Sequence, residues 1–157
     1  MTIVLAAVLF SVRPIDAIAA NTLERAAARS AIVRSLLDTL EQSDVIVHIQ
    51  SSRQLPAGIG GMTRFVANRG GHRYLRITIS TELSPEARIA MLAHELQHAR
   101  EIAGSSAQDV MEMRTLFRQR GKQDGDYFET QAAQRLERLV RTELRALEAE
   151  PVVKFHH

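Results

Sequence analysis

Between residues 73 and 104 the sequence changes from a two-residue to a helical period, and this change constrains the fold more than any other feature. Residues 73–79, RYLRITI, alternate apolar and polar side chains, which predicts a strand with one buried face. Ser84 is a favourable N-cap and Pro85 a favourable first residue for a helix, which Gly104 would end. A half-buried strand followed by such a helix predicts layers in which helices pack on a sheet.

Further periodic segments support an α+β fold. Asn21 and Glu24 can form a capping box for one long amphipathic helix, and β-branched runs predict strands. The expected ranges are 22–42 (helix), 45–50 and 62–67 (strands) and 127–148 (helix). A shorter helix, with Ser106 and Asp109 as its candidate caps, is expected to run to about Arg118. We expect a small, mostly antiparallel sheet packed on the helix at 85–103. No repeat or long linker divides the chain, so we expect one domain over residues 21–150 and a tail over 151–157.

The residue counts limit the chemistry of any site. The chain has 157 residues, no cysteine and a formal net charge of +2. The lack of cysteine excludes a disulfide scaffold, a thiolate zinc finger, an iron–sulfur centre and a cysteine nucleophile, so a metal would need histidine and carboxylate ligands. Aromatic residues make up only 4%, too few for a base-stacking surface, and the arginines interleave with acids. We therefore expect no nucleic-acid partner.

The N-terminal segment has the pattern of an export signal. Residues 2–12 are almost entirely apolar, too short to span a bilayer, which takes about 20 residues, but of signal-peptide length. Pro14 follows, and Ala17-Ile18-Ala19 has the form of a cleavage site, although no Lys or Arg precedes the run. We predict a signal peptide or uncleaved anchor over residues 1–20, and a periplasmic, secreted or membrane-tethered protein. The alternative is a buried N-terminal strand or helix.

The helix at 85–103 contains the sequence His94-Glu95-Leu96-Gln97-His98. Two histidines four residues apart lie one above the other on a helix, so both imidazoles can reach one metal ion. Glu95 lies beside them, where a carboxylate can accept a proton from a metal-activated water. Zinc suits imidazole ligands and this chemistry. The alternative is a solvent-facing histidine pair with Glu95 in an exposed ion pair.

Two histidines leave a catalytic zinc one protein ligand short. Glu129 is the favoured third ligand, because Ala132 and Ala133 would let its helix approach the histidine helix closely. We place Glu129 in the first turn of the helix at 127–148, while Asp124 and Asp126 in a polar loop are the alternatives. Glu101 lies about 10 Å along the axis from His94, too far to share the ion, so it would support the site from outside or be a surface charge.

The His94-Glu95-x-x-His98 and Glu129-x-x-Ala132 patterns resemble the zincin metallopeptidases of the compact gluzincin type, over about residues 45–140. The resemblance implies a zincin-like fold and zinc bound by His94, His98 and Glu129. It implies peptide-bond hydrolysis in which zinc polarises the carbonyl and its water. Glu95 then takes the water proton and passes it to the leaving amine.

The family also implies how substrate binds, through pairing of an extended peptide with the sheet edge, here expected at residues 73–79. Tyr127 is our candidate for stabilising the oxyanion, with Tyr74 and His72 as alternatives, although a structural role is the favoured explanation for each of them. The second hypothesis is a non-catalytic zincin-like domain that binds metal or peptide as a sensor or assembly factor. An open metal position favours the enzyme, and a fourth protein ligand favours the structural role.

Overall fold

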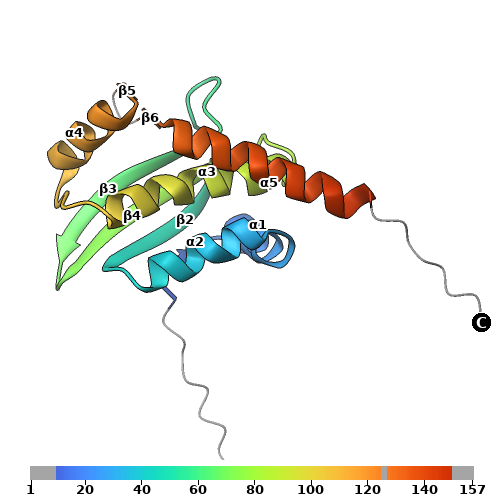
Figure 1. Cartoon of the computed structure of the whole chain (residues 1–157), viewed down its shortest axis with the longest axis horizontal. Helices are drawn as coiled ribbons and strands as arrows, with labels where there is room; N and C mark the ends of the chain where they lie inside the picture. Colours follow the sequence, from blue (N-terminus) through green and yellow to red (C-terminus); the bar gives the residue numbers. More distant parts are fainter. Residues whose placement is uncertain (1–9, 125–126, 150–157) are drawn as a thin grey trace, which may run out of the picture.

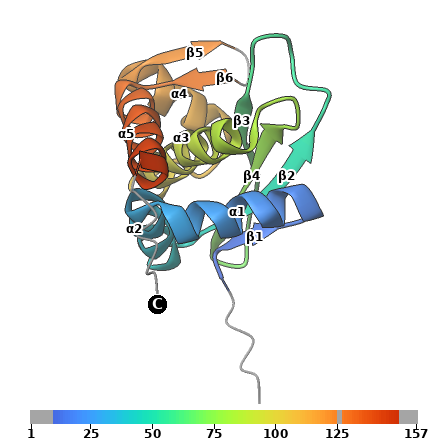
Figure 2. The ribbon, with the colours of Figure 1, turned by 90° about the vertical axis from the view of Figure 1, so that its right-hand side faces the viewer.

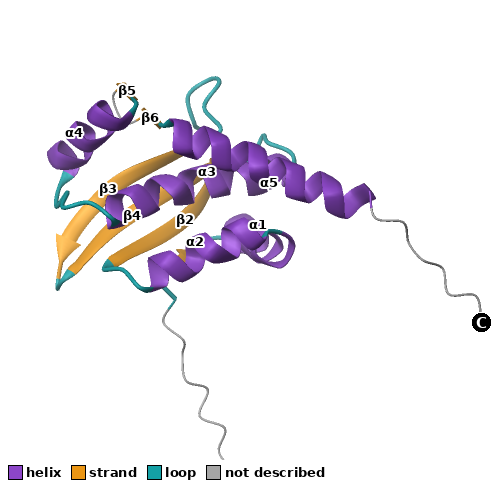
Figure 3. Cartoon of the chain, in the orientation of Figure 1, coloured by secondary structure: helices purple, strands orange, loops and turns teal. Residues whose placement is uncertain are grey.

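The computed structural model describes residues 10–124 and 127–149, which form an α+β fold (Figures 1 and 3). The helices are α1 (Ala17–Arg29), α2 (Ala31–Glu41), α3 (Pro85–Ala103), α4 (Val110–Arg120) and α5 (Gln131–Ala149). The strands of the main sheet are β1 (Val12–Pro14), β2 (Val45–Ser52), β3 (Gly61–Arg69) and β4 (His72–Ser80). A small second sheet pairs β5 (Lys122–Asp124) with β6 (Tyr127–Glu129).

The main sheet is mixed, and the expectation of a mostly antiparallel sheet was wrong. Its strand order is β1-β2-β4-β3, with β1 and β4 parallel to β2 and only β3 antiparallel to its neighbour. The tight turn with positive φ at Gly70 and Gly71 places β3 beside β4. Since β2 pairs with the other side of β4, residues 73–79 lie inside the sheet and not at its edge as expected. The edge strands are β1 and β3.

The single helix expected over 22–42 is two helices, α1 and α2, separated at Ser30. The Ser30 side chain accepts a hydrogen bond from the Val33 backbone and caps α2. Glu143 on α5 accepts hydrogen bonds from the Ser30 hydroxyl and the Ala31 backbone. A serine side chain that bonds the backbone competes with helix continuation, and the apolar period, which runs on through Ser30, does not reveal it.

Residues 12–20 are part of the fold, as in the alternative of a buried N-terminal strand. Val12 is buried and pairs with Val47 of β2, and Asp16 caps α1 by accepting from the Ala19 backbone. The predicted leader boundary at residue 20 therefore lies within α1, while residues 1–9 and the predicted tail lie outside the described residues. No helix of the described chain is both long and apolar enough to cross a membrane. Export stays a prediction.

The helices that pack on the sheet cover one of its faces, and α3 lies between the strands and α5 (Figure 2). Alternate strand residues point into this layer and form the core with α1, α2 and α3. The buried strand side chains include Val45, Val47, Ile49, Leu75, Ile77 and Ile79. The predicted alternation of buried and outward side chains over residues 73–79 is confirmed. Because α3 lies between the sheet and α5, residues on every side of that helix are buried.

Arg73 lies on this buried face and attaches β4 to the end of α3. Its guanidinium donates to both carboxylate oxygens of Asp44, at 2.8 and 2.6 Å. It also donates to four backbone carbonyls at the C-terminal end of α3 and just beyond, those of Ile102, Ala103, Ser105 and Ala107. A cation there satisfies carbonyls that have no partner within the helix and complements the helix dipole.

Arg73→Met is expected to lower the free energy of unfolding by about 3 kcal/mol, because several partly buried carbonyls lose their donor. Part of this loss comes from Asp44, whose pKa Arg73 lowers mainly through the hydrogen bond. This contribution of Asp44 to stability is fully present above the ordinary aspartate pKa near 3.8, and it is lost as the pH falls through the lower pKa that Asp44 has in the folded protein. Denaturant unfolding measures the change. Arg76→Met, on the exposed face of the same strand, is the control and should change stability little; equal effects would contradict the prediction.

Candidate metal centre

The two histidines and the glutamate of the motif lie in the middle of α3 and are buried. His94 is 4% exposed, Glu95 3% and His98 0%, because the sheet covers one side of α3 and α5 the other. The imidazole rings of His94 and His98 meet edge to face, with centroids 4.9 Å apart. The alternative of a solvent-facing histidine pair is therefore wrong.

Glu129 joins the two histidines, as the sequence predicted, but from a different element. It is the last residue of β6, and α5 begins only at Gln131, so the expected position in the first helical turn was wrong. Thr130 accepts a hydrogen bond from the Ala133 backbone in the manner of a helix cap, which leaves Glu129 before the helix. One ligand atom each from His94, His98 and Glu129 lie within 4.8 Å of one another.

Two polar atoms at this point have no hydrogen-bond partner among the described residues. They are His98 Nε2 and Glu129 Oε1, and both are buried. His94 Nε2 lies 3.4 Å from the same Glu129 oxygen. Buried polar atoms without a partner are costly, and imidazole nitrogen with carboxylate oxygen is a donor set that zinc accepts. The three residues thus fit a metal ion.

A carboxylate lies against the other nitrogen of each imidazole. His94 Nδ1 is 3.0 Å from Glu137 Oε2 on α5, and His98 Nδ1 is 3.0 Å from Glu101 Oε2. A carboxylate accepts, so each Nδ1 is the donor in these contacts, and Nε2 is the ring atom that each histidine has left for a metal. This carboxylate–histidine arrangement is the usual support of zinc ligands, and of the two roles predicted for Glu101 it has the supporting one.

The supporting carboxylates are themselves held. Thr130 donates to Glu101 at 3.0 Å, and Arg141 donates to Glu137 at 2.9 Å. Burial acts to raise the pKa of Glu101, but its bonds with His98 and Thr130 outweigh burial and lower it. The hydrogen bond with His94 lowers the pKa of Glu137. Both groups are therefore carboxylates at neutral pH, able to accept from the imidazoles.

His94 lies among three carboxylates. Burial acts to lower its pKa, but the nearby carboxylates of Glu137, Glu95 and Glu129 outweigh burial and raise it. The same concentration of negative charge that favours a proton on the imidazole also favours a divalent cation.

Strand β3 fixes the carboxylate of Glu95. Thr63 donates its hydroxyl proton to Glu95 Oε2 at 2.7 Å. A Cβ on Gly61 would lie 2.9 Å from Glu95 Oε1 and 2.8 Å from Met91 Cγ, so only glycine lets the strand come this close. One oxygen of Glu95 is thus held by Thr63, and the other lies against the Gly61 backbone.

Tyr127 is the one predicted oxyanion candidate that the structure places at the centre. Its hydroxyl donates to Glu129 Oε2 at 2.9 Å, and burial together with Glu129 raises its pKa to about 12. It helps line a hollow of about 170 Å³ beside His94, Glu95 and Glu129. Tyr74 lies on the exposed face of the sheet, stacked on His48, and His72 lies next to it, so neither belongs to the centre.

The alternative ligands do not join the cluster. Asp124 lies on β5, outside the three-residue group found in the described chain, and Asp126 lies outside the described residues. Sequence reasoning missed Glu137, Thr63 and Thr130. Glu137 faces His94 only because α5 packs along α3, and no local spacing links the two residues.

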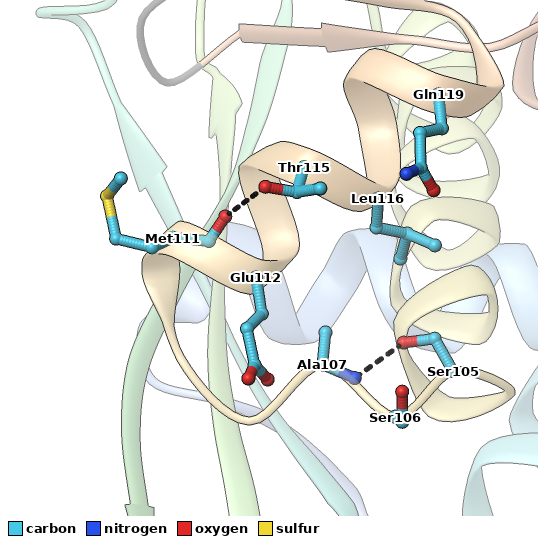
Figure 4. Close-up of a pocket in the computed structure, with 8 residues that line it drawn as sticks. All are labelled: Ser105, Ser106, Ala107, Met111, Glu112, Thr115, Leu116 and Gln119. Atoms are coloured by element: carbon cyan, nitrogen blue, oxygen red, sulfur yellow. Dashed lines mark hydrogen bonds between the residues drawn. The ribbon is translucent and has the colours of Figure 1, made fainter.

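A second hollow, of about 390 Å³, lies between α4 and the loop that follows α3 (Figure 4). Glu112 is its only titratable lining residue, and that carboxylate accepts a hydrogen bond from the Gln108 backbone at 2.6 Å. It brings no catalytic or metal-binding group together and is separate from the metal centre.

Comparison with protein families, with curated proteins and with solved structures finds no match to this chain. Its function therefore has to be inferred from the arrangement of its own residues.

Proposed function

We propose that this protein is a zinc-dependent metallopeptidase. The observation that carries the proposal is that ligand atoms of His94, His98 and Glu129 lie close together, and that two of these residues, His98 and Glu129, each have a buried polar atom without a hydrogen-bond partner. Glu95 is the next residue after the first ligand, His94. Among the described residues three groups form the cluster, and three protein ligands with an open position are typical of catalytic zinc. This favours an enzyme over the non-catalytic zincin-like domain.

Zinc bound there would supply a Lewis acid for the peptide carbonyl and lower the pKa of its water ligand to about 7. Glu95 accepts the proton of the attacking water and passes it to the leaving amine nitrogen. Thr63 holds the Glu95 carboxylate while the proton moves. Tyr127 stays protonated at neutral pH, with its pKa near 12. In our proposal its hydroxyl turns from Glu129 Oε2, to which it donates in this structure, and donates to the negative charge that develops on the carbonyl oxygen.

The substrate in this proposal is an extended peptide segment paired with β3. This strand is one of the two edges of the sheet, and it is the edge whose residues Gly61 and Thr63 lie against Glu95. Peptides commonly bind exposed sheet edges through main-chain hydrogen bonds. Pairing there would lay the scissile bond beside the hollow that Glu95 and Tyr127 line.

The direct test is metal analysis together with a peptide-library digest on the same preparation. We expect about one zinc per chain, hydrolysis that stops after removal of zinc by a chelator, and recovery on adding zinc back. Zinc without hydrolysis of any peptide would favour the non-catalytic domain. A purified chain that takes up no zinc would contradict both the peptidase proposal and the alternative of a non-catalytic metal-binding domain.

A further inference from the structure

The third ligand of the cluster lies on a small element of the fold, the hairpin of β5 and β6. Each of these strands has three residues, and Glu129 is the last residue of β6. A two-stranded hairpin is only marginally stable by itself in water. The position of Glu129 relative to His94 and His98 therefore depends on what the hairpin packs against.

Phe128 anchors the hairpin on α4. Successive strand residues point to opposite sides, so Tyr127 and Glu129 line the hollow at the centre while Phe128 points away from it and is buried. The ring of Phe128 stacks on Phe117 of α4, with centroids 4.5 Å apart. Phe117 also meets the ring of His98 edge to face, at 5.1 Å. One side chain of α4, the helix that lies beside the hairpin in Figure 2, thus contacts both a histidine ligand and the strand that carries Glu129.

Gly121 is the one residue between α4 and β5, and it lies directly against the end of β6. A Cβ on Gly121 would overlap the carbonyl oxygen of Glu129 and lie 3.2 Å from Thr130 Cα. Both are backbone atoms, which cannot turn aside as the end of a flexible side chain can. The φ of Gly121 is −172°, an extended value that other residues adopt, so glycine is needed here for space alone.

From these contacts we propose that Gly121 and Phe128 are positioning residues for the third metal ligand. Gly121 lets the chain pass against the Glu129 backbone, and Phe128 fixes β6 on α4, so that Glu129 Oε1 lies 3.4 Å from His94 Nε2. Metal ligands must be held within about 0.5 Å of their productive geometry, and a side chain at position 121 would displace the backbone of the ligand residue itself. The inference rests on the zinc centre proposed above and extends it to residues that do not touch the metal.

Gly121→Ala should weaken zinc binding by about 10–100-fold, the usual effect of changing a residue that orients a metal ligand. Competition with a chromogenic chelator measures the affinity. Gly104→Ala is the matched control, because Gly104 also follows a helix, its φ is −78° and a Cβ there would lie 3.6 Å from its nearest neighbour, the Arg100 carbonyl oxygen. This variant should bind zinc as the wild type does.

The same change in a Glu129→Ala background separates positioning from general damage to the fold. Once the ligand is gone, Gly121→Ala should change the remaining zinc affinity by no more than about twofold. Bound Co²⁺ gives a spectroscopic check, because its visible absorption depends on ligand geometry. Gly121→Ala should shift the Co²⁺ spectrum toward that of Glu129→Ala, and Gly104→Ala should leave it unchanged.

Phe128→Leu is a second variant that approaches the hairpin from its buried side, and it keeps the inference testable if circular dichroism shows that Gly121→Ala is unfolded. We expect it to weaken zinc binding by about tenfold, again only while Glu129 is present. Wild-type zinc affinity in either folded variant removes that residue from the proposal. An equal loss with and without Glu129 would show damage to the fold or to the histidine pair, and would overturn the proposal.

These outcomes separate the inference from the peptidase proposal. Zinc uptake without hydrolysis of any peptide contradicts the peptidase and leaves the positioning of Glu129 intact. Wild-type zinc affinity in both folded variants contradicts the positioning and leaves the peptidase intact. A wild-type chain that takes up no zinc contradicts both.

Discussion

Glu95→Gln is expected to lower the rate of peptide hydrolysis by about 10²–10⁴-fold and to leave zinc bound at the wild-type ratio. A general base contributes a rate factor of this size. The amide keeps the shape of the side chain and can still accept from Thr63, but it cannot take the proton of the attacking water. Metal analysis and a kcat measurement on one preparation show the two effects side by side.

Glu112→Gln is a matched control for this change. Glu112 is an exposed acid on α4, away from the centre, and its variant should keep both zinc and hydrolysis. If Glu95→Gln hydrolysed peptides at the wild-type rate, Glu95 would not be the base. If it lost zinc instead, Glu95 would act on the metal site itself.

Glu129→Ala should weaken zinc binding by more than about 100-fold and abolish hydrolysis with it. Removing a residue that only orients a ligand typically costs 10–100-fold in affinity, and removing a ligand should cost more. Glu137→Gln should show the smaller loss of zinc affinity, because Glu137 contacts His94 Nδ1 and is not one of the three clustered ligands. Competition with a chromogenic chelator gives the affinities of both variants.

Asp124→Asn tests the alternative third ligand in the same assay. We expect it to bind zinc as tightly as the wild type, since Asp124 lies outside the ligand cluster. Loss of zinc in Asp124→Asn together with retention in Glu129→Ala would reverse the assignment of the third ligand.

The sequence predicted those parts of the fold in which a local pattern and its end signals agree. The Ser84 cap, Pro85 and Gly104 predicted α3 to its last residue, and Asp109, one of the two candidate caps, is the N-cap of α4. The alternation at 73–79 predicted which side of β4 is buried. It could not predict the neighbours of β4, because strand order depends on contacts between distant segments. The edge was therefore assigned to the wrong strand.

The site was likewise predictable only where local spacing in the sequence brings its residues together. The spacing of His94 and His98 fixes their geometry on any helix. Glu129 was favoured because the small residues Ala132 and Ala133 would let its helix approach the histidine helix. Its element was wrong, since Thr130 caps α5 after it. Glu137 and Thr63 could not be found, because each reaches the centre only through the packing of α5 or β3 against α3.

Two glutamates of helix α5 form hydrogen bonds with separate parts of the chain. Near its middle Glu137 holds His94, and two turns later Glu143 accepts from Ser30 and Ala31 at the start of α2. A metal bound between α3 and Glu129, the last residue of β6, would therefore oppose local opening of α5 and of the first turn of α2 together. At a free zinc concentration about 100 times the dissociation constant, this is worth about 2.7 kcal/mol. Backbone amides in both segments would then exchange with deuterium about 100-fold more slowly, and these two regions, far apart in sequence, would respond to zinc as one cooperative unit.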